Sequence, residues 1–176
     1  MRKMSWLSNK VVLLDTCFII KALQYSDKKY FDSFFSVLME NNCRACISNM
    51  VLFEFVRGCK TPNHMKEKKK FLSGISAKIM DTPLSLILSA IKIANIYANK
   101  NIQTGQISST DCLNSALLQK YNNLVLITLD VADYPLIMHD RFDIMTIDTK
   151  KEILNIAFLS FIEEKFIKLS EERLIC

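Results

Sequence analysis

Short apolar runs alternate along this chain with longer segments of helical spacing, and this alternation constrains the fold more than any other feature. Residues 11–14 and 124–129 are apolar or β-branched runs, typical of strands buried on both faces. Between them, residues 29–41 carry apolar side chains at intervals of three and four, which predicts an amphipathic helix. Only three glycines and three prolines interrupt the 176 residues, so long regular elements are favoured. We therefore predict an α/β fold in which helices flank a central parallel sheet.

The remaining segments continue this pattern to the end of the chain. Further strands are expected at 45–48, 78–80 and 144–147, and further helices at 49–57, 64–73, 84–99 and 110–121. Ser48 and Ser109 are expected to cap two of these helices. The apolar face of the helix at 84–99 is formed by Leu84, Ile87, Leu88, Ile91, Ala94 and Ala98. The chain is expected to form a single domain over 1–176, with its core at about 11–148 and an extra C-terminal helix at about 150–173.

Charge and cysteine content narrow the class of protein. The chain carries 23 Lys and Arg against 18 Asp and Glu, a net charge of +5 that is compatible with a polyanionic partner, and its densest basic patch is 66–70. No uncharged apolar run reaches the roughly 18 residues of a membrane helix. Asp15 also interrupts the stretch that could imitate a secretion signal, so we expect a cytoplasmic protein without a membrane partner. The six cysteines lack the spacing of a disulfide framework, and we expect buried thiols.

Four acidic residues occupy positions where an open α/β sheet binds ligands. Asp15 ends the first predicted strand, Asp130 follows the strand at 124–129, and Asp111 opens a helix. Glu54 lies in an otherwise apolar helical segment. Ligands of such sheets bind beyond the carboxyl ends of the strands, near the point where the strand order reverses, so we expect the four carboxylates to converge. Each of three residues also has a structural explanation: Asp111 would stabilise a helix N-terminus, Asp130 a turn, and Glu54 an ion pair on the helix surface. Asp15 directly follows an apolar run and is harder to explain that way.

Converging carboxylates need a positive charge beside them. Oxygen ligands without histidine or cysteine suit Mg²⁺ or Mn²⁺. Such an ion lowers the pKa of a bound water and stabilises the charge that develops during attack on a phosphodiester. The residues therefore predict metal-dependent phosphodiester hydrolysis by a basic chain. Lys21, Arg57 and Arg141 are candidate phosphate contacts on charge alone.

Four short motifs, in this order, resemble those of PIN-domain nucleases, and of the VapC-type toxin ribonucleases most closely. They are Val-Val-Leu-Leu-Asp15-Thr16, Ile-Ser-Asn-Met-Val-Leu-Phe-Glu54-Phe-Val-Arg-Gly, Thr110-Asp111-Cys-Leu-Asn-Ser-Ala and Leu-Ile-Thr128-Leu-Asp130-Val-Ala-Asp133-Tyr134. The resemblance spans about 11–148. It implies a PIN-like sheet flanked by helices and an endoribonuclease that activates water, leaving a 5′-phosphate and a 3′-hydroxyl.

The resemblance also implies roles for individual residues. One or two divalent ions would be held by the catalytic carboxylates Asp15, Glu54, Asp111 and Asp130, with Asp133 as the alternative fourth ligand. Thr16 and Thr128 would support the site by hydrogen bonding. For VapC-like members the resemblance further implies an RNA substrate, a homodimer and a cognate antitoxin that blocks the site.

Three alternatives stay open at this point. The first is a non-catalytic PIN-like module that binds RNA or a protein without cutting. The second is a PIN nuclease that serves in RNA maturation or decay instead of acting as a toxin. The third is a flap-endonuclease-like enzyme that acts on DNA with the same acidic chemistry. Replacing Asp15 by Asn separates an enzyme from a binding module, because only the enzyme loses its turnover.

Overall fold

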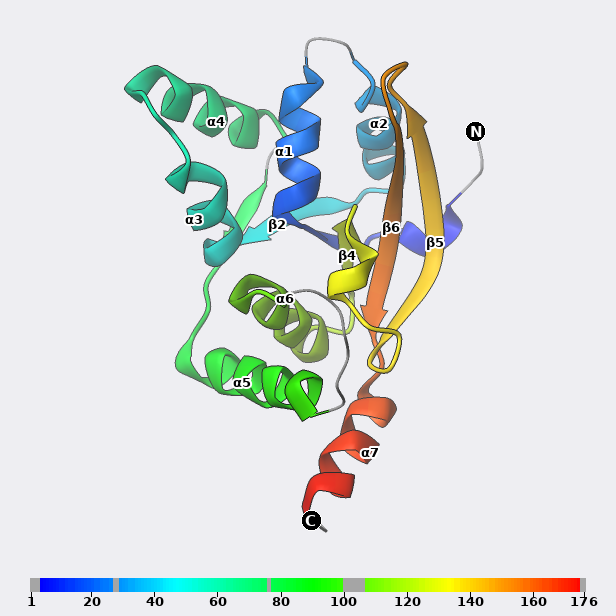
Figure 1. Ribbon diagram of the computed structural model, residues 1–176. Coiled ribbons are helices and arrows are strands. Elements are labelled where there is room, and N and C mark those ends of the chain that lie inside the picture. Colours follow the sequence, from blue (N-terminus) through cyan, green and yellow to red (C-terminus); the bar gives the residue numbers. More distant parts are fainter. Residues whose placement is uncertain (1–3, 27–28, 76, 100–106, 175–176) are drawn as a thin grey trace.

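A six-stranded sheet forms the centre of the computed structural model, which describes residues 4–26, 29–75, 77–99 and 107–174 (Figure 1). Its strands are β1 (Val11–Leu14), β2 (Arg44–Ser48), β3 (Lys78–Met80), β4 (Leu124–Thr128), β5 (His139–Asp148) and β6 (Ile153–Phe161), in the order β3-β2-β1-β4-β6-β5. The first four are parallel, whereas β6 pairs antiparallel with both β4 and β5. The predicted α/β fold with a parallel central sheet is therefore confirmed, with an antiparallel hairpin added at one edge.

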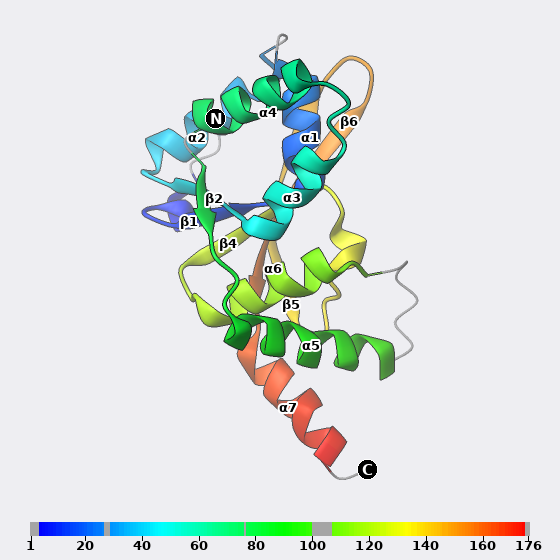
Figure 2. The ribbon, with the colours of Figure 1, turned by 90° about the vertical axis from the view of Figure 1, so that its left-hand side faces the viewer.

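Helices cover both faces of this sheet. They are α1 (Thr16–Gln24), α2 (Asp32–Glu40), α3 (Asn49–Arg57), α4 (Pro62–Gly74), α5 (Leu84–Asn99), α6 (Ser109–Lys120) and α7 (Glu163–Leu174). Helices α1 to α4 contribute to the core on one face, and α5, α6 and α7 to the core on the other. Seen from the side, α6 lies between the sheet and α5, which forms an outer layer (Figure 2). Among the described residues, every helix is too short or too polar to cross a membrane.

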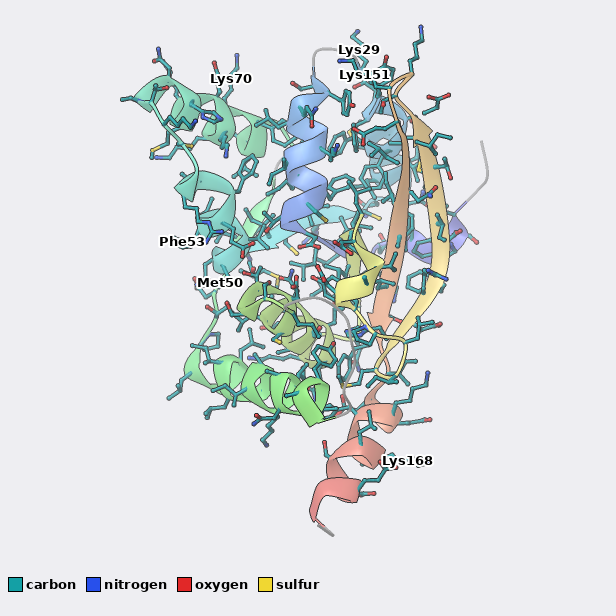
Figure 3. All side chains as sticks on the ribbon, viewed as in Figure 1. Lys29, Met50, Phe53, Lys70, Lys151 and Lys168 are labelled. Atoms are coloured by element: carbon teal, nitrogen blue, oxygen red, sulfur yellow. The ribbon has the colours of Figure 1, made fainter. Side chains whose placement is uncertain are left out.

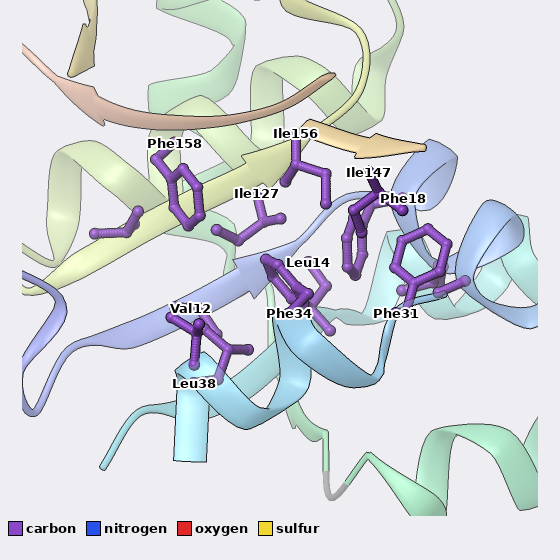
Figure 4. Packing of buried hydrophobic residues seen from close by; sticks show 14 of the residues in the cluster. Val12, Leu14, Phe18, Phe31, Phe34, Leu38, Ile127, Ile147, Ile156 and Phe158 are labelled. Carbon is purple, nitrogen blue, oxygen red and sulfur yellow. The ribbon is translucent and has the colours of Figure 1, made fainter. Parts of the chain in front are cut away.

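Strand β1 shows how the sequence produces the two layers. Successive side chains of a strand point to opposite faces, so Val12 and Leu14 enter the first core and Leu13 enters the second. In the first core Phe34 of α2 and Phe158 of β6 stack with centroids 6.3 Å apart (Figure 4). All five side chains are fully buried, and each such burial contributes about 1.5–3 kcal/mol.

Most of the predicted elements are present with small shifts of their ends. Ser48 caps α3 as predicted, since its hydroxyl accepts a 3.1 Å hydrogen bond from the Val51 amide. The cap of α6 was predicted one residue too late: Ser108, not Ser109, closes a capping box with Asp111. Helix α1, which directly follows β1, was not predicted from the sequence.

The C-terminal prediction was wrong in one respect. Residues 153–161 do not begin a helix but form β6, which runs back along β5, and only Glu163–Leu174 is helical. The final strand is also longer than the predicted 144–147. A short apolar run does not distinguish a strand from a buried helix, and here a turn decides between them. The Thr149 amide and hydroxyl both donate to the Glu152 carbonyl, and Lys150 has a φ of 61°, so the chain reverses.

Helix α5 is apolar on both sides, and the side that the structure buries is not the one identified from the sequence. Leu86, Ala90, Ile93, Ile96 and Tyr97 pack against α6 and the second core. The stripe from Leu84 to Ala98 that was identified from the sequence lies instead on the exposed side. Both stripes have helical periodicity, so periodicity alone does not indicate which one faces the sheet.

Candidate acidic site

The predicted acidic residues gather at the carboxyl ends of β1 and β4. The chain leaves β1 toward β2 on one side, whereas β4 pairs with β1 on the other, so this is where the strand order reverses. Asp15 directly follows β1 and is the N-cap of α1. Thr128 ends β4, and Asp130 caps the short 3₁₀ helix η3 (Val131–Asp133). The fold thus brings the first and fourth motifs together through adjacent parallel strands.

Asp15 is a buried carboxylate held at both oxygens. It is 4% exposed. Its Oδ1 accepts from the Thr16 amide at 2.7 Å, and its Oδ2 accepts from the Thr128 hydroxyl at 2.7 Å. Burial raises the pKa of Asp15 to about 6, the Thr128 hydrogen bond opposes this rise, and the charge of Asp111 adds to it. Asp15 is therefore fixed in place but is costly to ionise.

Glu54 links the second motif to the first and third. It projects from the second turn of α3, where its two oxygens accept 2.7 Å hydrogen bonds from the hydroxyls of Thr16 and Thr110. Thr16 opens α1 and Thr110 lies in the first turn of α6, so a single carboxylate ties three helices together. Glu54 is thus held by the hydroxyls of two threonines, and one of them, Thr16, is the residue expected to support the site.

Asp111 is held from two directions. Its Oδ2 accepts from the Ser108 amide at 2.9 Å and the Ser108 hydroxyl at 2.7 Å, and its Oδ1 accepts from the buried Tyr134 hydroxyl at 3.1 Å. The Asn114 amide donates to the Tyr134 hydroxyl at 3.2 Å and to Asp15 Oδ1 at 3.4 Å, so Asn114 and Tyr134 together connect the two aspartates. Burial raises the pKa of Asp111 despite the Ser108 hydrogen bonds, and the charge of Glu54 raises it further.

Asp130 and Asp133, the two candidates for the fourth carboxylate, differ in their surroundings. Asp130 is exposed, and its Oδ1 accepts from the Ala132 amide within its own turn. Asp133 is half-buried, and its pKa is raised to about 6 by burial and then by the charges of Asp111, Asp130 and Asp15. Asp133 therefore shares the electrostatic environment of the site more closely, although the Thr-x-Asp pattern favoured Asp130.

We call this group the acidic site (Asp15, Glu54, Asp111, Asp133). Burial is the largest cause of the raised pKa values of its three aspartates, and the charges of neighbouring carboxylates add to it. Among the described residues, none of these carboxylates forms an ion pair with a lysine, arginine or histidine. In the described part of the chain, no three acidic, histidine or cysteine side chains are close enough together to hold a metal ion as they stand. The donor set nevertheless fits Mg²⁺ or Mn²⁺, since hard oxygen ligands in repulsive proximity are what these ions bind.

Among the described residues, those proposed on charge alone form no ion pair with the acidic site. Lys21 forms a 2.6 Å ion pair with Glu152, and Arg141 is exposed on β5, the edge strand opposite β3. Arg57 is exposed in the last turn of α3, the helix that carries Glu54. The basic segment 66–70 lies on α4. Figure 3 shows oxygen atoms gathered between α3 and α6, and labelled Lys70 toward the outer end of the molecule.

The sequence analysis did not identify Ser108, Thr110, Asn114 and Tyr134 as site residues. Asn114 follows Asp111 by three residues on α6, so helical spacing could have placed both on one face. Cys17 makes weak 3.4 Å and 3.3 Å contacts with Asp15 Oδ2 and the Thr128 hydroxyl. Burial raises the pKa of its thiol to about 12, so the thiol is protonated at neutral pH.

Comparison with protein families, with curated proteins and with solved structures found no match for this chain.

Proposed function

We propose that this protein is a metal-dependent endoribonuclease of the PIN type. One observation carries the proposal: three separate motifs bring Asp15, Glu54 and Asp111 to the switch point of the sheet, where hydroxyl and amide donors hold each of them. Hydrogen bonds hold these carboxylates, but among the described residues no lysine, arginine or histidine forms an ion pair with them, so a bound cation would lower the cost of their burial. The net charge of +5 supports a polyanionic substrate.

The side chains of the site would position a divalent ion and a phosphodiester. Asp15, Glu54 and Asp111 would hold Mg²⁺ or Mn²⁺, with Asp133 in preference to Asp130 as the fourth ligand. Such an ion supplies a water of lowered pKa and a positive charge beside the scissile phosphate. Thr128 fixes Asp15 and Tyr134 fixes Asp111, so both carboxylates keep their orientation while the substrate binds. No covalent nucleophile is needed.

The test is cleavage of labelled single-stranded and structured RNA in the presence of Mg²⁺, Mn²⁺ or EDTA. The wild type is expected to cut with either metal and to stop in EDTA, and Asp15→Asn is expected to lose at least 100-fold in rate, about 2.7 kcal/mol of transition-state stabilisation. The matched control is Asp140→Asn, because Asp140 is an exposed aspartate on β5. If neither metal supports cutting while both proteins bind RNA equally, the protein is a binding module.

A toxin of a toxin–antitoxin pair, acting in the cytoplasm, is the biological role that we propose for this activity. The resemblance to VapC-type ribonucleases supports it, and a role in RNA maturation or decay is the alternative. Induced expression in a bacterium separates the two. A toxin is expected to arrest growth with the wild type and not with Asp15→Asn, and a cognate antitoxin would restore growth. Normal growth with an active nuclease would favour RNA processing.

A further inference from the structure

His139 is a buried histidine outside the acidic site, and both of its ring nitrogens have polar neighbours. It is 1% exposed and begins β5, directly after the segment 131–138 that connects β4 to β5 (Figure 1). Its Nδ1 lies 3.1 Å from the Pro135 carbonyl oxygen, and its Nε2 lies 3.1 Å from the Ser115 hydroxyl of α6. The proposed metal chemistry gives this side chain no role, so its placement calls for another explanation.

The two neighbours determine which ring nitrogen carries the hydrogen. A carbonyl oxygen only accepts hydrogen bonds, so Nδ1 is the donor to Pro135. In the neutral ring Nε2 then has no hydrogen and accepts from the Ser115 hydroxyl. Burial lowers the pKa of His139 to about 4, so the ring is neutral at pH 7. His139 therefore presents a fixed hydrogen-bond donor to the connecting segment.

Aromatic packing fixes the orientation of the imidazole. The ring packs edge to face with Tyr134 and with Phe161, and its centroid lies 5.5 Å from the centroid of each. Tyr134 is itself fully buried and comes from the connecting segment, whereas Phe161 ends β6. The imidazole is thus held between the sheet and the connecting segment, with Nδ1 directed at Pro135.

The carbonyl that His139 contacts is next to the residue that holds Asp111. The Tyr134 hydroxyl donates to Asp111 Oδ1 at 3.1 Å, and Pro135 directly follows Tyr134. The preferred fourth carboxylate, Asp133, directly precedes Tyr134. The Pro135 carbonyl also closes the turn that follows, since it accepts the Met138 amide at 3.1 Å. The position of this one carbonyl oxygen therefore affects both Tyr134 and Asp133.

We propose that His139 is a positioning residue of the acidic site. Its Nδ1 hydrogen holds the Pro135 carbonyl, and this contact keeps the adjacent Tyr134 hydroxyl directed at Asp111. The polar contacts of the imidazole within the described chain are with Pro135 and Ser115, so it acts through the connecting segment. The consequence for metal binding rests on the proposed function, whereas the anchoring of the segment can be measured without a metal.

A pair of variants, His139→Asn and His139→Gln, separates this role from a purely structural one. The amide nitrogen of asparagine is attached to Cγ, as Nδ1 is, and can still donate to Pro135. The amide of glutamine lies one bond farther out, as Nε2 does, and matches Ser115 instead. Asparagine leaves the larger cavity, so a purely structural role predicts that His139→Asn is the more perturbed variant. The positioning role predicts the opposite ranking.

Amide hydrogen exchange in EDTA measures the anchoring of the segment. The Tyr134 and Met138 amides donate to the carbonyls of Val131 and Pro135, so their exchange reports on the segment. Both amides are expected to exchange about tenfold faster in His139→Gln than in the wild type, and to stay within about threefold of the wild type in His139→Asn. Equal exchange in the wild type and His139→Gln, or faster exchange in His139→Asn than in His139→Gln, overturns the proposal.

Calorimetric titration with Mg²⁺ tests the link to Asp111. His139→Gln is expected to lower the Mg²⁺ affinity about tenfold, and His139→Asn less than about threefold. In the Tyr134→Phe background His139→Gln is expected to lower the affinity by less than about twofold more, because both changes remove the same contact to Asp111. Fully additive losses would overturn the route through Tyr134. If the wild type binds no Mg²⁺ while His139→Gln still loosens the segment, the proposed function fails and the anchoring by His139 holds.

Discussion

Asp15→Asn is expected to make the metal-free protein more stable at neutral pH. In the folded protein the pKa of Asp15 is about 6, against 3.8 for the ordinary group. A carboxyl whose pKa is raised by folding contributes stability below the unfolded pKa and loses it as the pH rises through the folded pKa. The two-unit shift costs the wild type roughly 3 kcal/mol above pH 6. The asparagine is neutral and avoids this cost.

Part of the gain is lost because the amide matches its neighbours less well. Asp15 accepts hydrogen bonds at both oxygens, and the amide nitrogen of asparagine cannot accept the one from Thr128. That mismatch costs about 1 kcal/mol, so the free energy of unfolding is expected to rise by about 2 kcal/mol. The increase should shrink as the pH falls below 6, and below about pH 3, where the wild-type carboxyl is protonated in both states, the wild type should be the more stable by about 1 kcal/mol.

Urea unfolding in EDTA at pH 7, monitored by circular dichroism, measures this difference in the free energy of unfolding. The control is Asp140→Asn, which is expected to lie within about 0.5 kcal/mol of the wild type. Added Mg²⁺ should reverse the ranking. At 100 times its dissociation constant it stabilises the wild type by about 2.7 kcal/mol and leaves Asp15→Asn almost unchanged. A metal-free Asp15→Asn protein that is less stable than the wild type would refute the electrostatic reasoning.

Three other measurements test separate parts of the structure. Tyr134→Phe removes the hydroxyl that donates to Asp111, so calorimetric Mg²⁺ affinity is expected to fall about tenfold, and equal affinity would contradict a positioning role. His139 is buried and its pKa is lowered to about 4. Between pH 7.5 and 4.5 the free energy of unfolding of the wild type should therefore fall by about 2.5 kcal/mol more than that of His139→Gln. If the unfolding free energies of the two proteins change with pH in the same way, His139 is not buried in its neutral form. Phe34→Ala should lower the free energy of unfolding in urea by about 3–5 kcal/mol. Met39→Ala should lower it by less than about 0.5 kcal/mol, because the Met39 side chain is 76% exposed. Similar losses for the two variants would contradict the assigned core.

The acidic residues could be located from the sequence because their positions follow from chain direction. Asp15 comes directly after an apolar run, and parallel strands place their carboxyl ends at one edge. The donors that hold them could not be located in the same way. Tyr134 reaches Asp111 across the end of the sheet, and this contact depends on the path of the η3 turn. A polar network of this kind is fixed by tertiary packing, which a local pattern does not encode.

The two wrong structural expectations have one physical cause. Residues 153–161 and the two sides of α5 are apolar enough to be buried in more than one way, and local periodicity cannot choose among them. In the first case the reversal at 149–152 decides, because it brings β6 alongside β5. In the second, α6 covers one side of α5 and leaves the other side exposed.

Helix α6 connects the acidic site to α5. Residues 110–118 of this helix are all buried, since the sheet lies on one side of it and α5 lies on the other. Asp111 and Asn114 are therefore held against the site only as firmly as α5 holds α6.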